Sequence, residues 1–158
     1  MEPHPKLTPR LQSIARAYQE RGWHVHFYPF AAFVEEGSMS FEMRDGVGTG
    51  TASSLNPIFT TYGKVQGVAQ ARTIDLAAFI SSLPRGTVKL MKLDIEGSEF
   101  KVVPHMAGKG ALCQDVVTEA FIEVHPRPKE GISVETGWAE IKRALAGTRM
   151  GSEPCTPT

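Results

Sequence analysis

Cysteine is scarce in this sequence of 158 residues, which contains only Cys113 and Cys155. Two cysteines are too few for a disulfide framework, and their spacing matches no metal-binding motif. We therefore interpret Cys113 as a small buried thiol and Cys155 as a thiol in the C-terminal tail. This use of cysteine is compatible with a reducing compartment.

The sequence also lacks long apolar runs and a surplus of one charge. No run approaches the roughly 20 apolar residues of a membrane-spanning helix. The opening residues, MEPHPKLTPR, have no apolar core that would indicate a signal peptide. The 17 lysines and arginines balance the 17 aspartates and glutamates, and basic residues do not cluster. We therefore expect a soluble, cytoplasmic protein that neither spans a membrane nor binds nucleic acid.

The remaining composition is that of one globular domain, with 41% hydrophobic and 22% charged residues. Apolar residues at helical spacing predict amphipathic helices, the first stopped by Gly22 and the second capped by Thr73 or Asp75. Short runs rich in aromatic and β-branched residues predict strands between them. The predicted elements are a helix over 8–21, a strand within 24–33 ending near Pro29, a strand over 38–44, a long loop over 45–70, a helix over 76–83, a strand over 88–95, a helix beginning at 96, a strand over 116–124 and a helix over 138–146.

Helices that alternate with short apolar strands are typical of an α/β fold whose sheet is largely parallel. In such sheets, ligands bind beyond the carboxyl ends of the strands. The polar residues that directly follow each predicted strand are therefore the first candidates for a functional site.

The strand over 88–95 ends in charged residues. Lys92, Asp94 and Glu96 alternate, so we expect them to share one face, and Glu99 lies in the first turn of the next helix. Charges gathered at a strand end are costly to bury without partners or a ligand. The alternative is that Glu96 and Glu99 only favour the positive end of the helix dipole.

The next strand ends in Glu123 and His125, which should also share one face. A histidine that titrates near neutrality is a suitable general base for a hydroxyl nucleophile, although a single histidine is more often structural. A metal site formed by Asp94, Glu96, Glu123 and His125 is a further alternative, without a tight spacing motif to support it.

The segment DGVGTG over 45–50 imitates a nucleotide-binding loop. Such a loop needs a buried strand before it and a helix directly after it. The following residues, TASSLNP, show no helical stripe, so we interpret the segment as a turn.

The combination KLDIEGSEF and, one strand later, IEVHP resembles the FkbM-type methyltransferases. In that family one strand ends in Lys-x-Asp-x-Glu-Gly-x-Glu and a later strand ends in Glu-x-His. The resemblance covers residues 2–146 in the same order. It includes the opening Glu-Pro-His-Pro over 2–5, Ala31-Ala32, Ser53-Ser54-Leu55 and Thr73-Ile74-Asp75.

The resemblance implies a Rossmann-like class I methyltransferase fold with S-adenosylmethionine as the methyl donor. It implies O-methylation of a hydroxyl group on a small molecule or glycan. Glu2 would bind the ribose hydroxyls of the cofactor and Ala31 would lie near its adenine. Asp94 and Glu96 would lie beside the sulfonium and the acceptor, and His125 would orient or deprotonate the acceptor hydroxyl.

One departure from the family pattern concerns the N-terminus. The family has a first strand and a glycine-rich loop before Glu-Pro-x-Pro, whereas here Met1 directly precedes Glu2. We therefore expect a class I sheet that lacks this strand and loop. The expected organisation is a partial methyltransferase domain over 1–147 and a disordered tail over 148–158. The alternative to a methyltransferase is a non-catalytic remnant or interaction domain.

Overall fold

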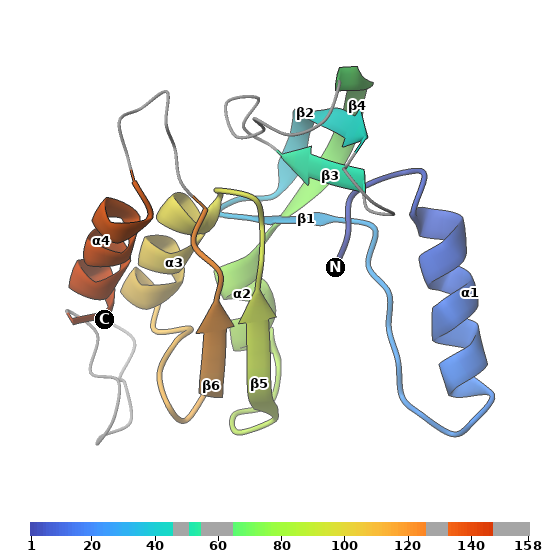
Figure 1. The fold of residues 1–158 in the computed structure, drawn as a ribbon. Coiled ribbons are helices and arrows are strands. Elements are labelled where there is room, and N and C mark those ends of the chain that lie inside the picture. The colour runs from blue at the N-terminus through green and yellow to red at the C-terminus, as the bar shows by residue number, and fades with distance from the viewer. Residues whose placement is uncertain (46–50, 55–64, 126–132, 147–158) are drawn as a thin grey trace.

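The computed structural model describes residues 1–45, 51–54, 65–125 and 133–146. Strands and helices alternate from residue 65 onward, as the sequence predicted, whereas strands follow one another over residues 31–75 (Figure 1). The elements are α1 (Thr8–Gln19), β1 (Ala31–Phe33), β2 (Gly37–Asp45), β3 (Thr51–Ser54), β4 (Val65–Asp75), α2 (Leu76–Ser82), β5 (Val88–Leu93), α3 (Glu99–Gly108), β6 (Val117–Ile122) and α4 (Val134–Ala146).

The described strands form two separate sheets. One has the order β1-β4-β2-β3, and the other is the pair β5-β6. The prediction of parallel strands is confirmed for β1 with β4 and for β5 with β6. It is wrong for β2, which is antiparallel to both β3 and β4. The protein is therefore a mixed α/β protein rather than one with a single parallel sheet.

Two predicted elements differ from the structure. The strand expected to end near Pro29 begins after it, because only Ala31 to Phe33 find a partner in β4. The loop predicted over 45–70 contains β3 and the start of β4, both of which pair with β2. Pairing along β2, rather than alternation in these glycine- and serine-rich segments, makes them strands. Residues 46–50 of the glycine-rich segment lie outside the described part, as do 55–64 and the tail from 147 onward.

The helices lie close to their predicted positions. After α1, Gly22 adopts a left-handed conformation with φ of 84°. At the start of α2, the side chain of Asp75 accepts a hydrogen bond from the amide of Ala78 at 3.0 Å, which confirms Asp75 as the cap. Burial opposes the ionised form of Asp75. The hydrogen bonds from Ala78 and from His105, 3.0 Å away, nevertheless lower its pKa.

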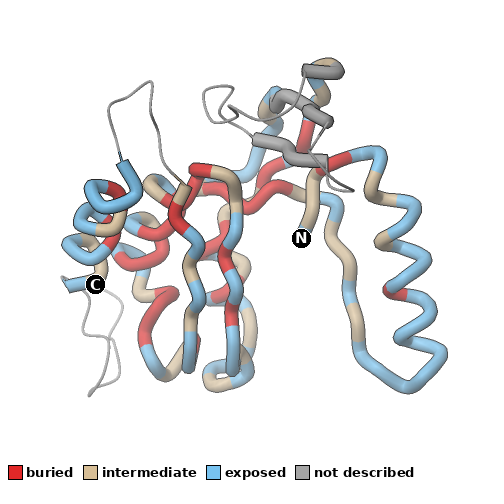
Figure 2. Tube along the Cα trace, in the orientation of Figure 1, coloured by how far each residue is buried: buried red, intermediate tan, exposed pale blue. Residues whose placement is uncertain are grey.

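The main core lies between the β5–β6 pair and α2, α3 and α4 (Figure 2). Its fully buried side chains include Met106, Leu112 and Ile141. α1 stands apart from this core and buries only Ala15 (Figure 1). The opposite face of the β5–β6 pair carries Leu90 and Phe121, which are 61% and 56% exposed.

The two helices beside the β5–β6 pair approach each other at Gly137 of α4. A β-carbon at this position would lie 2.6 Å from Cζ of Phe100 in α3 and 3.1 Å from Cγ1 of Val124 after β6. Carbon atoms in contact are normally about 3.5–4.0 Å apart. Glycine therefore permits the close packing of α4 against α3 and against the end of β6.

Two further predictions concern the membrane and the cysteines. No helix within the described residues is long and apolar enough to cross a membrane. Cys113 is buried, as predicted, but it is disulfide-bonded, so its interpretation as a free thiol is wrong. Disulfides persist mainly in oxidising compartments, so the cysteines no longer support a reducing one. Cys155 lies outside the described residues.

Candidate functional site at the ends of β5 and β6

The charged ends of β5 and β6 meet, as their sequence positions predicted. The two strands are parallel neighbours, with Leu93 opposite Ile122. The ammonium group of Lys92 lies 2.9 Å from a carboxylate oxygen of Asp94 and 3.3 Å from one of Glu123. These two contacts, together with hydrogen bonds to both carboxylates, raise the pKa of Lys92. Lys92 thus joins the segments that follow the two strands.

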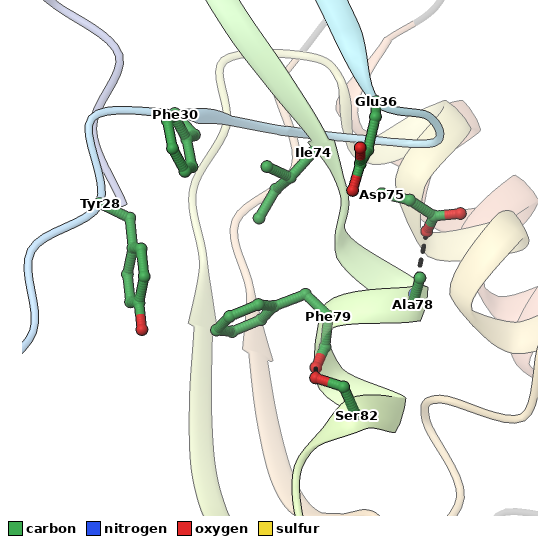
Figure 3. A pocket seen from close by; sticks show the side chains of 8 residues that line it. All are labelled: Tyr28, Phe30, Glu36, Ile74, Asp75, Ala78, Phe79 and Ser82. Carbon is green, nitrogen blue, oxygen red and sulfur yellow. Dashed lines mark hydrogen bonds between the residues drawn. The ribbon is translucent and has the colours of Figure 1, made fainter.

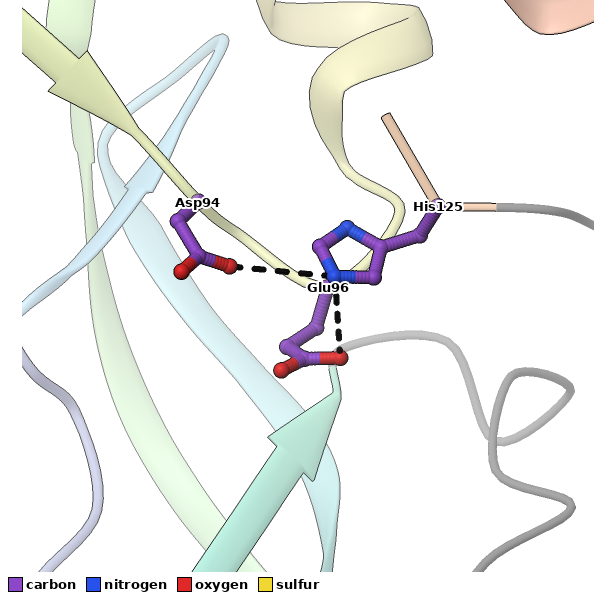
Figure 4. A group of neighbouring side chains, drawn as sticks. All are labelled: Asp94, Glu96 and His125. Carbon is purple, nitrogen blue, oxygen red and sulfur yellow. Dashed lines mark ion pairs between the residues drawn. The ribbon is translucent and has the colours of Figure 1, made fainter. Parts of the chain in front are cut away.

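His125 lies at the centre of the group (Figure 4). Its Nε2 atom is 3.7 Å from Asp94 and 3.6 Å from Glu96, so the structure brings together the three predicted catalytic residues. Glu123 is at the edge of the group, 4.0 Å from Nε2. The side chain of His125 is 20% exposed, so it is not fully enclosed by the described residues.

Glu96 reaches His125 through an unusual backbone conformation. Its φ of 52° places it in the left-handed region, which is rare for residues other than glycine, asparagine and aspartate. Gly97 follows with φ of 95°. Alternation along an extended strand, on which the prediction for Glu96 was based, therefore stops before this residue. Such conformations cost on the order of 1 kcal/mol and are concentrated at functional sites.

Glu99 also belongs to the group, on the Nδ1 side of His125, although its role was not predicted. It is the first residue of α3, and its side chain is fully buried. Its Oε1 atom lies 3.0 Å from Nδ1 of His125 and accepts a hydrogen bond from the amide of Ile95 at 2.9 Å. The helix-dipole interpretation of Glu99 is therefore incomplete, because this carboxylate directly contacts the histidine.

The surroundings shift two pKa values upward. The pKa of His125 is raised mainly by the hydrogen bond to Glu99. This effect outweighs burial, which lowers the pKa, and the charges of the nearby carboxylates raise it further. The pKa of Glu96 is raised mainly by burial, which outweighs the lowering of this pKa by the charge of His125. Both groups therefore hold a proton more strongly than they would in water.

The group carries net negative charge whether or not His125 is protonated, because four carboxylates face one lysine and one histidine. Its members are Asp94, Glu96, Glu99, Glu123, Lys92 and His125. Such a site favours a cationic ligand. Asp94, Glu96 and His125 also offer one ligand atom each within 4.8 Å of one another, close enough to share a metal ion. Exposed acidic groups often gather without a metal, and Lys92 already supplies a positive charge beside Asp94.

The two remaining predicted residues, Glu2 and Ala31, are not members of this group. The amide of Glu2 donates to the carbonyl of Tyr28 at 3.1 Å, so the N-terminal segment runs beside the chain that leads into β1. The carboxylate of Glu2 accepts a hydrogen bond from the amide of His4 at 2.8 Å. Ala31 is 3% exposed and packs with Ala71. The side chain of Ala31 is thus covered, whereas Glu2 is half-buried.

A separate cavity of about 280 Å³ lies between the segment before β1 and helix α2 (Figure 3). Its lining includes three aromatic residues, Tyr28, Phe30 and Phe79, and the rings of Tyr28 and Phe79 meet edge to face with centroids 5.5 Å apart. None of Asp94, Glu96 and His125 lines it. We therefore place the candidate site at the strand ends and not in this cavity.

In α/β proteins, ligands bind beyond the carboxyl ends of parallel strands, which is where these charged residues converge. Residues 1–150 match the family model of the methyltransferase FkbM domain, so the chain belongs to this family. No curated protein and no solved structure matches the chain significantly. The match confirms the predicted family and makes the protein a member of a methyltransferase family.

Proposed function

We propose that the protein transfers a methyl group from S-adenosylmethionine to a hydroxyl group of a small molecule or glycan. The family supports methyl transfer. The observation that carries the rest is the negatively charged group around His125, because the donor carries a positive sulfonium and a hydroxyl nucleophile needs a proton acceptor. We take residues 1–147 as the methyltransferase domain and assign it to the Rossmann-like class.

Each residue of the site has a role in this proposal. Asp94 lies beside the donor, and Glu96 helps to stabilise positive charge. His125 accepts the acceptor's proton at Nε2 while the oxygen bonds to the methyl carbon. When bound, S-adenosylmethionine would supply the methyl group, and its sulfur would keep the electron pair of the broken carbon–sulfur bond and become neutral. Glu2 would bind the ribose. The backbone of Ala31 would lie beside the adenine, because the side chain of Ala31 is buried. Most of the rate enhancement would come from positioning.

The test is calorimetric titration of the purified chain with S-adenosylmethionine and with neutral S-adenosylhomocysteine. Saturable binding of both is expected. Asp94→Asn should weaken binding of the cation by about tenfold relative to the neutral ligand, because a charge pair near a protein surface contributes on the order of 1 kcal/mol or more. The melting temperature should change little, because the side chain of Asp94 is 37% exposed. Glu119→Gln, at an exposed position of β6, is the control.

Failure of the folded chain to bind either ligand would refute the proposal and favour a non-catalytic domain. A metal-dependent hydrolase is the second candidate, favoured by the three ligand atoms that lie within 4.8 Å. It predicts saturable binding of Mn²⁺ or Mg²⁺ in the absence of any nucleoside ligand, and loss of that binding in Asp94→Asn.

A further inference from the structure

We propose that Glu99 is the positioning residue that fixes the orientation and tautomer of His125, so that Nε2 presents its lone pair to the site. This inference rests on the proposed role of His125 as proton acceptor. It assigns a function to a residue that the dipole of α3 alone does not explain.

The first argument is the hydrogen-bonding capacity of the two groups. An ionised carboxylate can only accept hydrogen bonds. Oε1 of Glu99 lies 3.0 Å from Nδ1 of His125, so Nδ1 carries a proton whenever the ionised carboxylate forms this bond. In the neutral imidazole, the other nitrogen must then be the acceptor. The contact with Glu99 therefore selects the tautomer in which Nε2 can take a proton.

The second argument is the rigidity of Glu99. Its side chain has no solvent exposure, and the amide of Ile95 donates to the same Oε1 atom at 2.9 Å. This hydrogen bond fixes the carboxylate to the turn that follows β5. A buried carboxylate needs such partners, because removing its charge from water is costly. The histidine thus contacts an anchored group and not a mobile surface side chain.

The third argument is the position of Nε2. Among the described residues, the carboxylates around the imidazole come from three segments. Asp94 and Glu96 follow β5, Glu123 follows β6, and Glu99 begins α3. Of these four carboxylates in the described part of the chain, Glu99 faces Nδ1, whereas the other three lie 3.6 to 4.0 Å from Nε2. A proton accepted at Nε2 would therefore be stabilised by carboxylates, while Glu99 continues to hold the opposite side of the ring.

The division of roles follows from these contacts. Glu99 acts through His125 and does not itself line the accessible side of the site, since it is fully buried. Removing its charge should change the protonation of His125 without moving the groups that face Nε2. Glutamine keeps an oxygen that can accept from both Nδ1 and the amide of Ile95. Glu99→Gln therefore separates the charge of Glu99 from its shape.

The experiment is ¹⁵N NMR of the imidazole of His125 in the full chain, in the presence of EDTA and without any methyl donor or acceptor. In the wild type at high pH, we expect a protonated Nδ1 and an unprotonated Nε2. Glu99→Gln should lower the pKa of His125, because the loss of a hydrogen-bonded negative charge weakens the imidazolium. Glu119→Gln, which removes an exposed charge of β6, should leave the tautomer and the pKa unchanged.

Two results would overturn the inference. One is a neutral wild-type histidine with its proton on Nε2, a measurement that requires no variant to fold. The other is a folded Glu99→Gln protein in which the pKa of His125 is unchanged. Because neither measurement uses a methyl donor, the inference can fail while the proposed methyl transfer stands, and the reverse also holds.

Discussion

Replacing Gly137 with alanine tests whether the close packing of α4 determines both stability and the geometry of the site. The added β-carbon would lie 2.6 and 2.7 Å from two ring atoms of Phe100, and 3.1 Å from a methyl carbon of Val124. Phe100 directly follows Glu99, and Val124 directly precedes His125. The side chains that must move therefore belong to residues adjacent in sequence to Glu99 and His125, whose contact orients the imidazole.

The magnitude follows from two opposing effects. Alanine in a helix interior is favoured over glycine by about 1 kcal/mol. Overpacking a tight contact costs about 1–3 kcal/mol, and here the ring of Phe100 must retreat by roughly 1 Å to reach an ordinary carbon contact distance. We expect Gly137→Ala to lower the free energy of unfolding by up to about 2 kcal/mol, with the gain in helix propensity partly offsetting the clash.

The assay is equilibrium unfolding in urea, with the slope of the transition compared between variants. Gly108→Ala is the matched control, because a β-carbon at the end of α3 would meet nothing within 4 Å. The control should be neutral or slightly more stable than the wild type. The NMR signals of His125 should shift in Gly137→Ala and not in Gly108→Ala. If both variants are stabilised equally, the close approach of α4 does not constrain the packing and the reasoning is wrong.

Two further predictions concern pH and a helix cap. The pKa values of Glu96 and His125 are both raised on folding, so the folded chain binds more protons than the unfolded chain between these groups' ordinary and raised pKa values. The free energy of unfolding should therefore fall as pH rises above 4.5, the ordinary value for glutamate, and fall further above 6.5, the ordinary value for histidine. Urea unfolding at about pH 5 and about pH 8 checks this, and a flat or rising profile would contradict it. Asp75→Ala should cost about 1 kcal/mol because the amide of Ala78 loses its cap. Asp75→Asn should keep most of that stability in thermal unfolding, and equal losses in both would exclude capping as the cause.

The sequence predicted the elements whose signals are local. Helices with a regular apolar stripe were found near their expected bounds, and Asp75 caps α2 as its position suggested. The convergence of Asp94 and His125 was also predictable, because parallel neighbouring strands end at the same edge of a sheet. β3 and the first part of β4 were missed, since their strand state depends on pairing with β2 and not on their own residues.

The contact between Glu99 and His125 was missed for a different reason. The two residues are 26 positions apart, and nothing in the sequence states that α3 turns the side chain of Glu99 inward. A glutamate at the start of a helix has a sufficient local explanation in the helix dipole. Its complete burial is a property of the assembled structure. Gly137 is similar, because a glycine within a helical pattern indicates a packing requirement only when its neighbours are known.

The position of Gly137 also bears on the order in which the chain assembles during synthesis. Domains generally fold as units, which for this domain requires that all of its helices have been synthesised. Glu99 and His125 are both synthesised before α4, yet the residues beside them are packed against a helix that begins at Val134. The packing of the site described here is therefore complete only when α4 has docked against α3 and Val124.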